Sequence, residues 1–157
     1  MGGIEFRAIE MGALVLAGIF FRDAWRRGKH WLPSLIWGMV MGFCIELAIV
    51  RVADNSIPHY TYDTEQFISV AGIPVWVAVG WGIILYSSLW TALQWSDRLL
   101  KQALIAGGLA LNIDVSLEGV AQGLGFWVWS WPPGAAGARI DFLGVPFDNF
   151  CSLRSDR

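Results

Sequence analysis

Long apolar stretches separated by short charged segments make up most of this chain. Residues 31–50 and 68–95 form two such stretches, the first interrupted only by Glu46 and the second without any charge. A third, residues 102–131, is uncharged except for Asp114 and Glu118. Each is long enough to cross a bilayer, which takes about 17–25 residues. Residues 11–21 are apolar but short, so they predict a marginal first helix.

The pattern therefore predicts an all-α fold: a polytopic integral membrane helix bundle of about four transmembrane helices. All of residues 1–157 belong to one membrane-embedded domain, because no soluble domain or linker interrupts the series. Lys and Arg concentrate in segments 21–30 and 96–101, whereas segment 51–67 has three acids against one Arg. The positive-inside rule places the two basic segments in the cytoplasm and the acidic one, with the N-terminus, outside.

This topology predicts the depth of the three intramembrane acids. A helix rises about 1.5 Å per residue, so Glu46 lies roughly 22 Å from the cytoplasmic start of its helix. Asp114 and Glu118 lie roughly 18 and 24 Å from the start of theirs. We therefore expect all three in the outer half, near the loop that carries His59 and the tyrosines Tyr60 and Tyr62.

Composition agrees with a membrane protein and excludes several functions. Hydrophobic residues make up 55% of the chain and the mean hydropathy is +0.51. A net charge of −2 gives no basic field, so we expect no nucleic-acid partner. The spacing of Cys44 and Cys151 predicts neither a disulfide framework nor a zinc site. With only two histidines and no glycine-rich phosphate loop, we expect no metal and no cofactor.

Asp114 and Glu118 are the strongest candidates for chemistry. A charge at bilayer depth costs roughly 2.5–3.5 kcal/mol, so an intramembrane acid indicates a functional site. At positions i and i+4 they share a helix face, and desolvation with like-charge repulsion should keep one of them protonated. Such a pair suits general acid/base catalysis. The alternative is a polar contact between helices, with Asn112 and Ser116 contributing.

The other candidates have ordinary explanations as well. Glu46 is a candidate for the site, and the alternative is that it simply reaches the outer interface. His59, Tyr60 and Tyr62 are residue types that anchor loops at a membrane surface. Trp76 and Trp81 lie deeper, where a ring face can stabilise a cation. An aromatic belt at the interfaces explains the tryptophans near predicted helix ends, which are Trp31, Trp90, Trp95, Trp127, Trp129 and Trp131.

Several short motifs occur together in the later two-thirds of the chain. They are Tyr60-Thr-Tyr62, Gly72-Ile-Pro74, Asp114-Val-Ser-Leu-Glu118, Gly125-Phe-Trp127-Val-Trp129 and Gly144-Val-Pro146-Phe-Asp-Asn149. In this order and approximate spacing, the chain resembles the carotenoid biosynthesis membrane protein family, which includes bacterial and archaeal carotenoid hydratases. The resemblance runs from about residue 42 to residue 150, and Glu46 matches an acidic position of the family.

The resemblance implies an integral protein of the bacterial or archaeal cytoplasmic membrane that acts on a carotenoid or related polyene lipid. The reaction it implies is cofactor-free addition of water to the terminal double bond of an acyclic end group. Asp114 and Glu118 would form the acid/base pair, with Glu46 orienting water or acting as an alternative base. The expected substrate contacts are His59, Tyr60, Tyr62, Trp76, Trp81, Trp127 and Asn149.

Three departures from the family pattern accompany the resemblance, and one of them is a short front with a marginal first helix. Gly119 follows Glu118 where relatives often have Asp-Pro, and residues 151–157 replace an expected Gly-Trp and further membrane helix. We therefore expect an aberrant or disordered tail and a C-terminally truncated member of the family. The alternative functions are a non-catalytic module that binds a polyene or a partner, and a small proton or ion site. Sequence alone does not indicate an oligomeric state.

Overall fold

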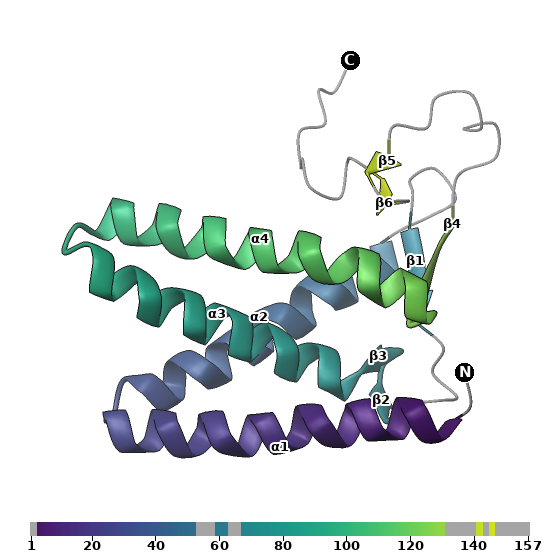
Figure 1. Cartoon of the computed structure of the whole chain (residues 1–157), viewed down its shortest axis with the longest axis horizontal. Helices are drawn as coiled ribbons and strands as arrows, with labels where there is room; N and C mark the ends of the chain where they lie inside the picture. Colours follow the sequence, from purple (N-terminus) through teal and green to yellow (C-terminus); the bar gives the residue numbers. More distant parts are fainter. Residues whose placement is uncertain (1–2, 53–58, 63–66, 131–140, 143–144, 147–157) are drawn as a thin grey trace.

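Four long helices dominate the fold (Figure 1). The computed structural model describes residues 3–52, 59–62, 67–130, 141–142 and 145–146. Its helices are α1 (Gly3–Arg27), α2 (Trp31–Val52), α3 (Val75–Trp95) and α4 (Leu99–Leu124). Helix α3 packs against α1, α2 and α4, so it is the centre of the bundle.

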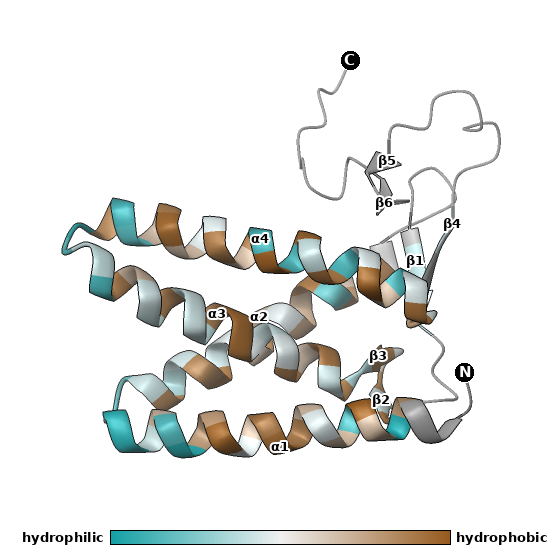
Figure 2. Cartoon of the chain, viewed as in Figure 1, coloured by the Kyte–Doolittle hydropathy of each residue, from teal (hydrophilic) through white to brown (hydrophobic). Residues whose placement is uncertain are grey.

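Three of these helices, α2, α3 and α4, are long and apolar enough to cross a membrane. Apolar residues recur along their length (Figure 2), and many large ones on α4 are exposed, including Leu100 at 73% and Leu104 at 68%. Such faces suit lipid rather than water. The chain is therefore an integral membrane protein with an all-α bundle, as the sequence predicted. Helix α1 has 25 residues and is much longer than the marginal segment 11–21.

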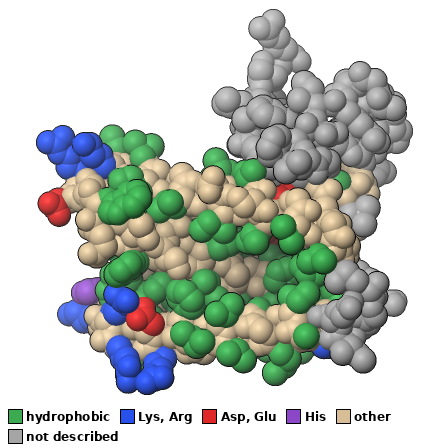
Figure 3. Space-filling model, viewed as in Figure 1, with side chains coloured by type: hydrophobic (Ala, Val, Ile, Leu, Met, Phe, Trp, Pro, Cys, Tyr) green, Lys and Arg blue, Asp and Glu red, His purple; other side chains and the backbone are tan. Residues whose placement is uncertain are grey.

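The two ends of the bundle differ in their content of basic side chains. Lys and Arg gather at the end where the α1–α2 and α3–α4 turns lie, away from the strands (Figure 3). At this end Asp23 accepts hydrogen bonds from Arg27 Nε at 2.5 Å and from Tyr86 Oη at 2.8 Å, which ties α1 to α3. The clustering fits the predicted cytoplasmic side, which stays a prediction.

The residues before α3 are not helical, which corrects the prediction of one helix over residues 68–95. Strands β2 (Ser69–Val70) and β3 (Ile73–Pro74) pair as a tight hairpin. Its two turn residues, Ala71 and Gly72, have φ values of 53° and 85°, and positive values at both positions are typical of a two-residue type I′ turn. Pro74 then precedes the first turn of α3, so the helix begins only at Val75.

A buried acid holds this hairpin against α1. Glu10 is only 3% exposed, and its Oε1 accepts a hydrogen bond from the backbone N–H of Ile68 at 2.8 Å. Its Oε2 pairs with Arg7 at 2.9 Å. No sequence pattern singles out Glu10, because its partner is a backbone group 58 positions away.

Helix α4 ends before the predicted residue 131, and the chain then forms a strand. Gly125 has φ 74° and ψ 30°, and its N–H bonds to the carbonyl of Gln122 while the N–H of Phe126 bonds to that of Ala121. This pair of bonds is the Schellman motif, which a glycine in the left-handed region favours. The chain leaves the helix there and enters β4 (Trp127–Ser130).

Strand β4 pairs antiparallel with β1 (His59–Tyr62), and we call this pair the aromatic ribbon. Tyr60 lies opposite Trp129, and Tyr62 lies opposite Trp127. Alternate residues of a strand point to the same face, so all four rings are on one face of the ribbon. A further short pair is formed by β5 (Asp141–Phe142) and β6 (Val145–Pro146).

Glycines let α2 and α3 approach closely. A Cβ atom on Gly42 would lie 2.2 Å from Cβ of Trp81, and one on Gly82 would lie 3.2 Å from the carbonyl oxygen of Leu35. Close helix approach through small residues is typical of membrane bundles. The indole of Trp81 consequently packs on α2 one turn before Glu46.

Candidate functional site

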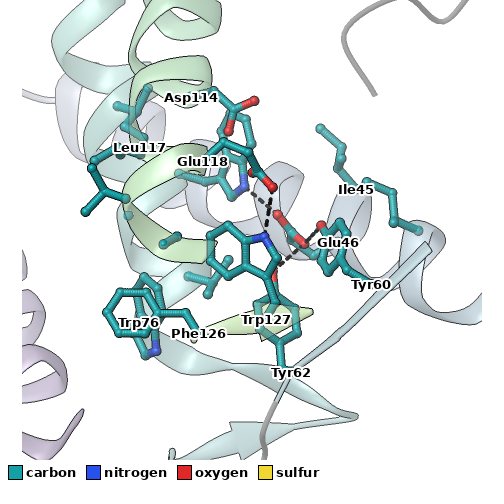
Figure 4. Close-up of a pocket in the computed structure, with 17 residues that line it drawn as sticks. Ile45, Glu46, Tyr60, Tyr62, Trp76, Asp114, Leu117, Glu118, Phe126 and Trp127 are labelled. Carbon is teal, nitrogen blue, oxygen red and sulfur yellow. Dashed lines mark hydrogen bonds between the residues drawn. The ribbon is translucent and has the colours of Figure 1, made fainter. Parts of the chain in front are cut away.

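A small cavity lies at the end of the bundle that carries the aromatic ribbon (Figure 4). Its volume is about 170 Å³, and helices α2, α3 and α4 line it together with the ribbon. We call it the acidic cavity, because Glu46, Asp114 and Glu118 all line it. No Lys or Arg is among the described residues that line it.

Glu46 of α2 is held by three hydrogen-bond donors. Its Oε2 accepts from the hydroxyls of Tyr60 and Tyr62, the latter at 2.7 Å, and its Oε1 accepts from Trp81 Nε1 at 2.8 Å. Burial raises the pKa of both tyrosines, and the negative charge of Glu46 adds to the rise. Both phenols therefore keep their protons and donate. With 5% exposure, Glu46 is a buried acceptor in fixed geometry.

Glu118 of α4 is held by two indole groups from the strand that follows its helix. Its Oε1 accepts from Trp127 Nε1 and from Trp129 Nε1, both at 2.8 Å. An indole N–H can only donate, so this carboxyl oxygen is an acceptor. Glu118 is also 5% exposed. The turn at Gly125 brings the two indole groups to it, and their hydrogen bonds offset the free-energy cost of burying its carboxyl group.

Asp114 differs from both glutamates. It is half-buried and lines the acidic cavity one helical turn before Glu118, yet it makes no hydrogen bond with any described residue. Its carboxyl group is therefore the least constrained of the three acids. The described residues include no group of three or more His, Cys, Asp or Glu side chains arranged to hold a metal ion.

Aromatic rings make up much of the remaining wall. Trp76, Trp81 and Trp127 line the cavity with Tyr60 and Tyr62. The ring of Trp76 is backed by Phe126, with centroids 5.4 Å apart, and by Phe67 at 5.6 Å. Ring faces attract cations, so the cavity combines carboxyl groups and aromatic faces, with no Lys or Arg in the described part of its wall.

The structure brings together eight of the predicted site residues. Those that line the acidic cavity are Glu46, Tyr60, Tyr62, Trp76, Trp81, Asp114, Glu118 and Trp127. His59 lies in β1 opposite Ser130. Asn149 and the predicted tail, residues 151–157, lie outside the described residues.

Trp129 is the residue that the sequence reasoning missed. We assigned it to an aromatic belt at a helix end, but it lies in a strand and its indole binds Glu118. The alternation Trp-Val-Trp after a glycine was the available signal, because alternation with period two is typical of strands. Trp127, which we assigned to the same belt, also lies in β4 and donates to the same oxygen atom.

Comparison with known families identifies the chain. The sequence model of the carotenoid biosynthesis protein family matches residues 6–153. The protein belongs to this family. The match covers the whole acidic cavity and extends the resemblance seen in the motifs toward both ends of the chain. No curated protein and no solved structure is significantly similar to it.

Proposed function

We propose that this carotenoid biosynthesis protein adds water to the terminal double bond of an acyclic carotenoid end group, without a cofactor, in the cytoplasmic membrane of a bacterium or archaeon. One observation carries the proposal. Three carboxyl groups and several aromatic rings line one small apolar cavity, and one of the acids, Asp114, has no hydrogen-bond partner among the described residues. Membership of the carotenoid biosynthesis family supports a carotenoid as the class of substrate.

Asp114 is the proposed proton donor. An acid that gives its proton to a carbon atom must reach that atom, and strong hydrogen bonds to other groups would hold it back. Asp114 lines the cavity without such bonds, whereas each glutamate accepts at least two. Its proton adds to the less substituted carbon of the terminal alkene, the π bond breaks, and a tertiary carbocation forms at the other carbon.

The carbocation is stabilised by the cavity walls until water adds. The faces of Trp76, Trp81 and Trp127 supply cation–π attraction, and the anionic glutamates supply charge. A water oxygen forms the new C–O bond, and Glu118 accepts the released proton. Glu118 then returns a proton to Asp114, one helical turn away, so alkene and water give a tertiary alcohol and the acids are restored.

Glu46 is the proposed electrostatic and water-orienting group. Three donors fix its carboxyl group in place, and a prearranged charge needs no reorganisation when the cation develops. Tyr60 and Tyr62 act through it and also shape the cavity wall. Contacts of the substrate with His59 and Asn149 remain part of the proposal on the resemblance alone.

Binding of a polyene without chemistry is the second candidate function. It is favoured by the hydrogen bonds that engage one oxygen of Glu118 and both oxygens of Glu46, as expected for structural acids. This alternative assigns no proton transfer to Asp114. Changing that residue distinguishes the two functions.

The test is expression in a bacterium that makes lycopene, with pigments separated by chromatography and identified by mass. We expect a new pigment heavier by one water, which Asp114→Asn and Glu118→Gln should lose. Ser116→Ala is the matched control, because Ser116 lies between them on α4, is exposed, and within the described part of the chain bonds only to its own helix. It should hydrate as the wild type does.

Membrane insertion of every variant is measured in the same cells by fractionation. Unchanged pigments with the wild-type protein inserted would contradict hydration of this substrate and support the binding function. Normal hydration by both acid variants would contradict the assigned roles while leaving the reaction itself in place.

A further inference from the structure

The acidic cavity is much smaller than a carotenoid. Its volume is about 170 Å³, and an apolar protein cavity of about 150 Å³ accommodates benzene. The space therefore suits a group of about six carbon atoms, such as one branched isoprene unit. A whole carotenoid is several times larger, so most of a bound molecule must lie outside the cavity.

Apolar side chains at the rim indicate where the rest of the molecule would lie. Ile45 of α2 and Leu117 and Val120 of α4 line the cavity and are 43%, 50% and 57% exposed. Ile45 and Leu117 lie on opposite sides of the acids (Figure 4). Since α2 and α4 are two of the helices long and apolar enough to span a membrane, exposed apolar side chains on them suit contact with lipid.

The packing of the bundle leaves room for an opening of the cavity between α2 and α4. Helix α3 packs against both α2 and α4, and the aromatic ribbon connects these two helices at the same end. The back and the end of the cavity are thus closed by α3 and by the ribbon. The side between α2 and α4 is lined by the exposed apolar residues.

We propose that the acidic cavity receives only the terminal branched unit of an acyclic polyisoprenoid, which slides in from the lipid between α2 and α4. The remaining chain stays in the bilayer and is not recognised. The identity of this ligand rests on the proposed function. The size limit predicts that a cyclised end group, a six-membered ring with three methyl groups, is excluded.

Gly80 provides a way to test the size limit. It lines the cavity, and a Cβ atom added to it would meet no heavy atom within 4 Å. Gly80→Leu therefore places about four carbon atoms in a space that holds about six. Gly108→Leu is the matched control: Gly108 also has open space around its Cβ position, but it is exposed on α4 and does not line the cavity.

The experiment measures the thermal unfolding of purified protein in phosphatidylcholine nanodiscs by calorimetry. The ligands are lycopene, β-carotene, and a short branched alkene with the same isopropylidene end. A ligand that binds only the folded protein at about 100 times its Kd should raise Tm by roughly 5–10 °C. We expect lycopene and the short alkene to raise the Tm of the wild type and of Gly108→Leu, and β-carotene to leave both unchanged.

Gly80→Leu should keep a normal unliganded Tm and lose both shifts. Gly80→Ala, which adds one methyl group, should show reduced shifts and serves if the larger variant does not fold. An equal shift by β-carotene, a shift by lycopene without one by the short alkene, or full shifts in the Gly80 variants would overturn the proposal. These measurements need no turnover, so a failure of hydration in cells and a failure of end-group binding remain distinguishable.

Discussion

Removing the hydrogen bond from Tyr62 to Glu46 is the smallest change that tests the geometry of the acidic cavity. Tyr62→Phe removes the hydroxyl that donates to Glu46 across 2.7 Å. It leaves the ring, which packs against Trp127 with centroids 5.7 Å apart. The change therefore releases one of three donors without creating a hole.

The size of the effect follows from the charge on the acceptor. A hydrogen bond to a charged group contributes about 1.5–3 kcal/mol, and about 1.4 kcal/mol corresponds to tenfold in rate. If Glu46 must hold its position while the cation forms, hydration should slow roughly 10- to 150-fold. The rate is the appearance of hydrated lycopene in isolated membranes, divided by the amount of inserted protein.

Tyr86→Phe is the matched control at the other end of the bundle. Tyr86 also donates to a carboxylate, Asp23 Oδ2 at 2.8 Å, but it does not line the acidic cavity. Both variants should unfold at a lower temperature, and only Tyr62→Phe should slow hydration. Wild-type rates in Tyr62→Phe would refute the role of the Glu46 geometry. Equal slowing in both variants would show that lost stability, not the site, limits the rate.

Two other changes test the partners of the acids and the packing that positions them. Trp129→Phe removes one of the two indole donors to Glu118, so hydration per inserted protein should fall roughly tenfold; an unchanged rate in the membrane assay would contradict this assignment. Gly42→Ala would put a Cβ atom 2.2 Å from that of Trp81, so Tm measured by calorimetry should fall and hydration with it. Gly12→Ala is its control, because no heavy atom lies within 4 Å of the added Cβ, and Tm should hold or rise, as expected when alanine replaces glycine within a helix.

The hydropathy pattern predicted the apolar helices and the position of the three acids at one end of the bundle, because both depend on distances along whole helices. Residues 31–50 match the apolar part of α2, and the rise per residue put Glu46, Asp114 and Glu118 at one end. Hydropathy could not locate the helix ends. Residues 69–74 and 127–130 carry no charge and are continuous in hydropathy with the helices beside them, yet the first segment forms a hairpin and the second a strand. Local backbone signals at Gly72 and Gly125 decide these boundaries.

The hydrogen-bond partners of the two glutamates could not be predicted for a related reason. Tyr60 and Tyr62 reach Glu46, and Trp127 and Trp129 reach Glu118, only because the ribbon aligns all four rings on one face. A register shifted by one residue would turn one strand's rings away from the acids. The register follows from the exact start of β4, which depends on the turn at Gly125. Sequence motifs could name these residues but not pair them.

The three acids differ in the number of hydrogen-bond donors around them, and this difference is the main reason to propose a chemical role for Asp114. Burying a polar group without a partner costs free energy, and a structural acid should therefore have donors around it. Glu46 and Glu118 have three and two neutral donors, which offset that cost without supplying a counter-charge. Asp114 has none among the described residues, although it lies in the same cavity. A purely structural role for all three acids would leave the missing donors around Asp114 unexplained. Under the proposed function Asp114 donates a proton to the substrate, and that transfer requires a carboxyl group that no other donor or acceptor holds.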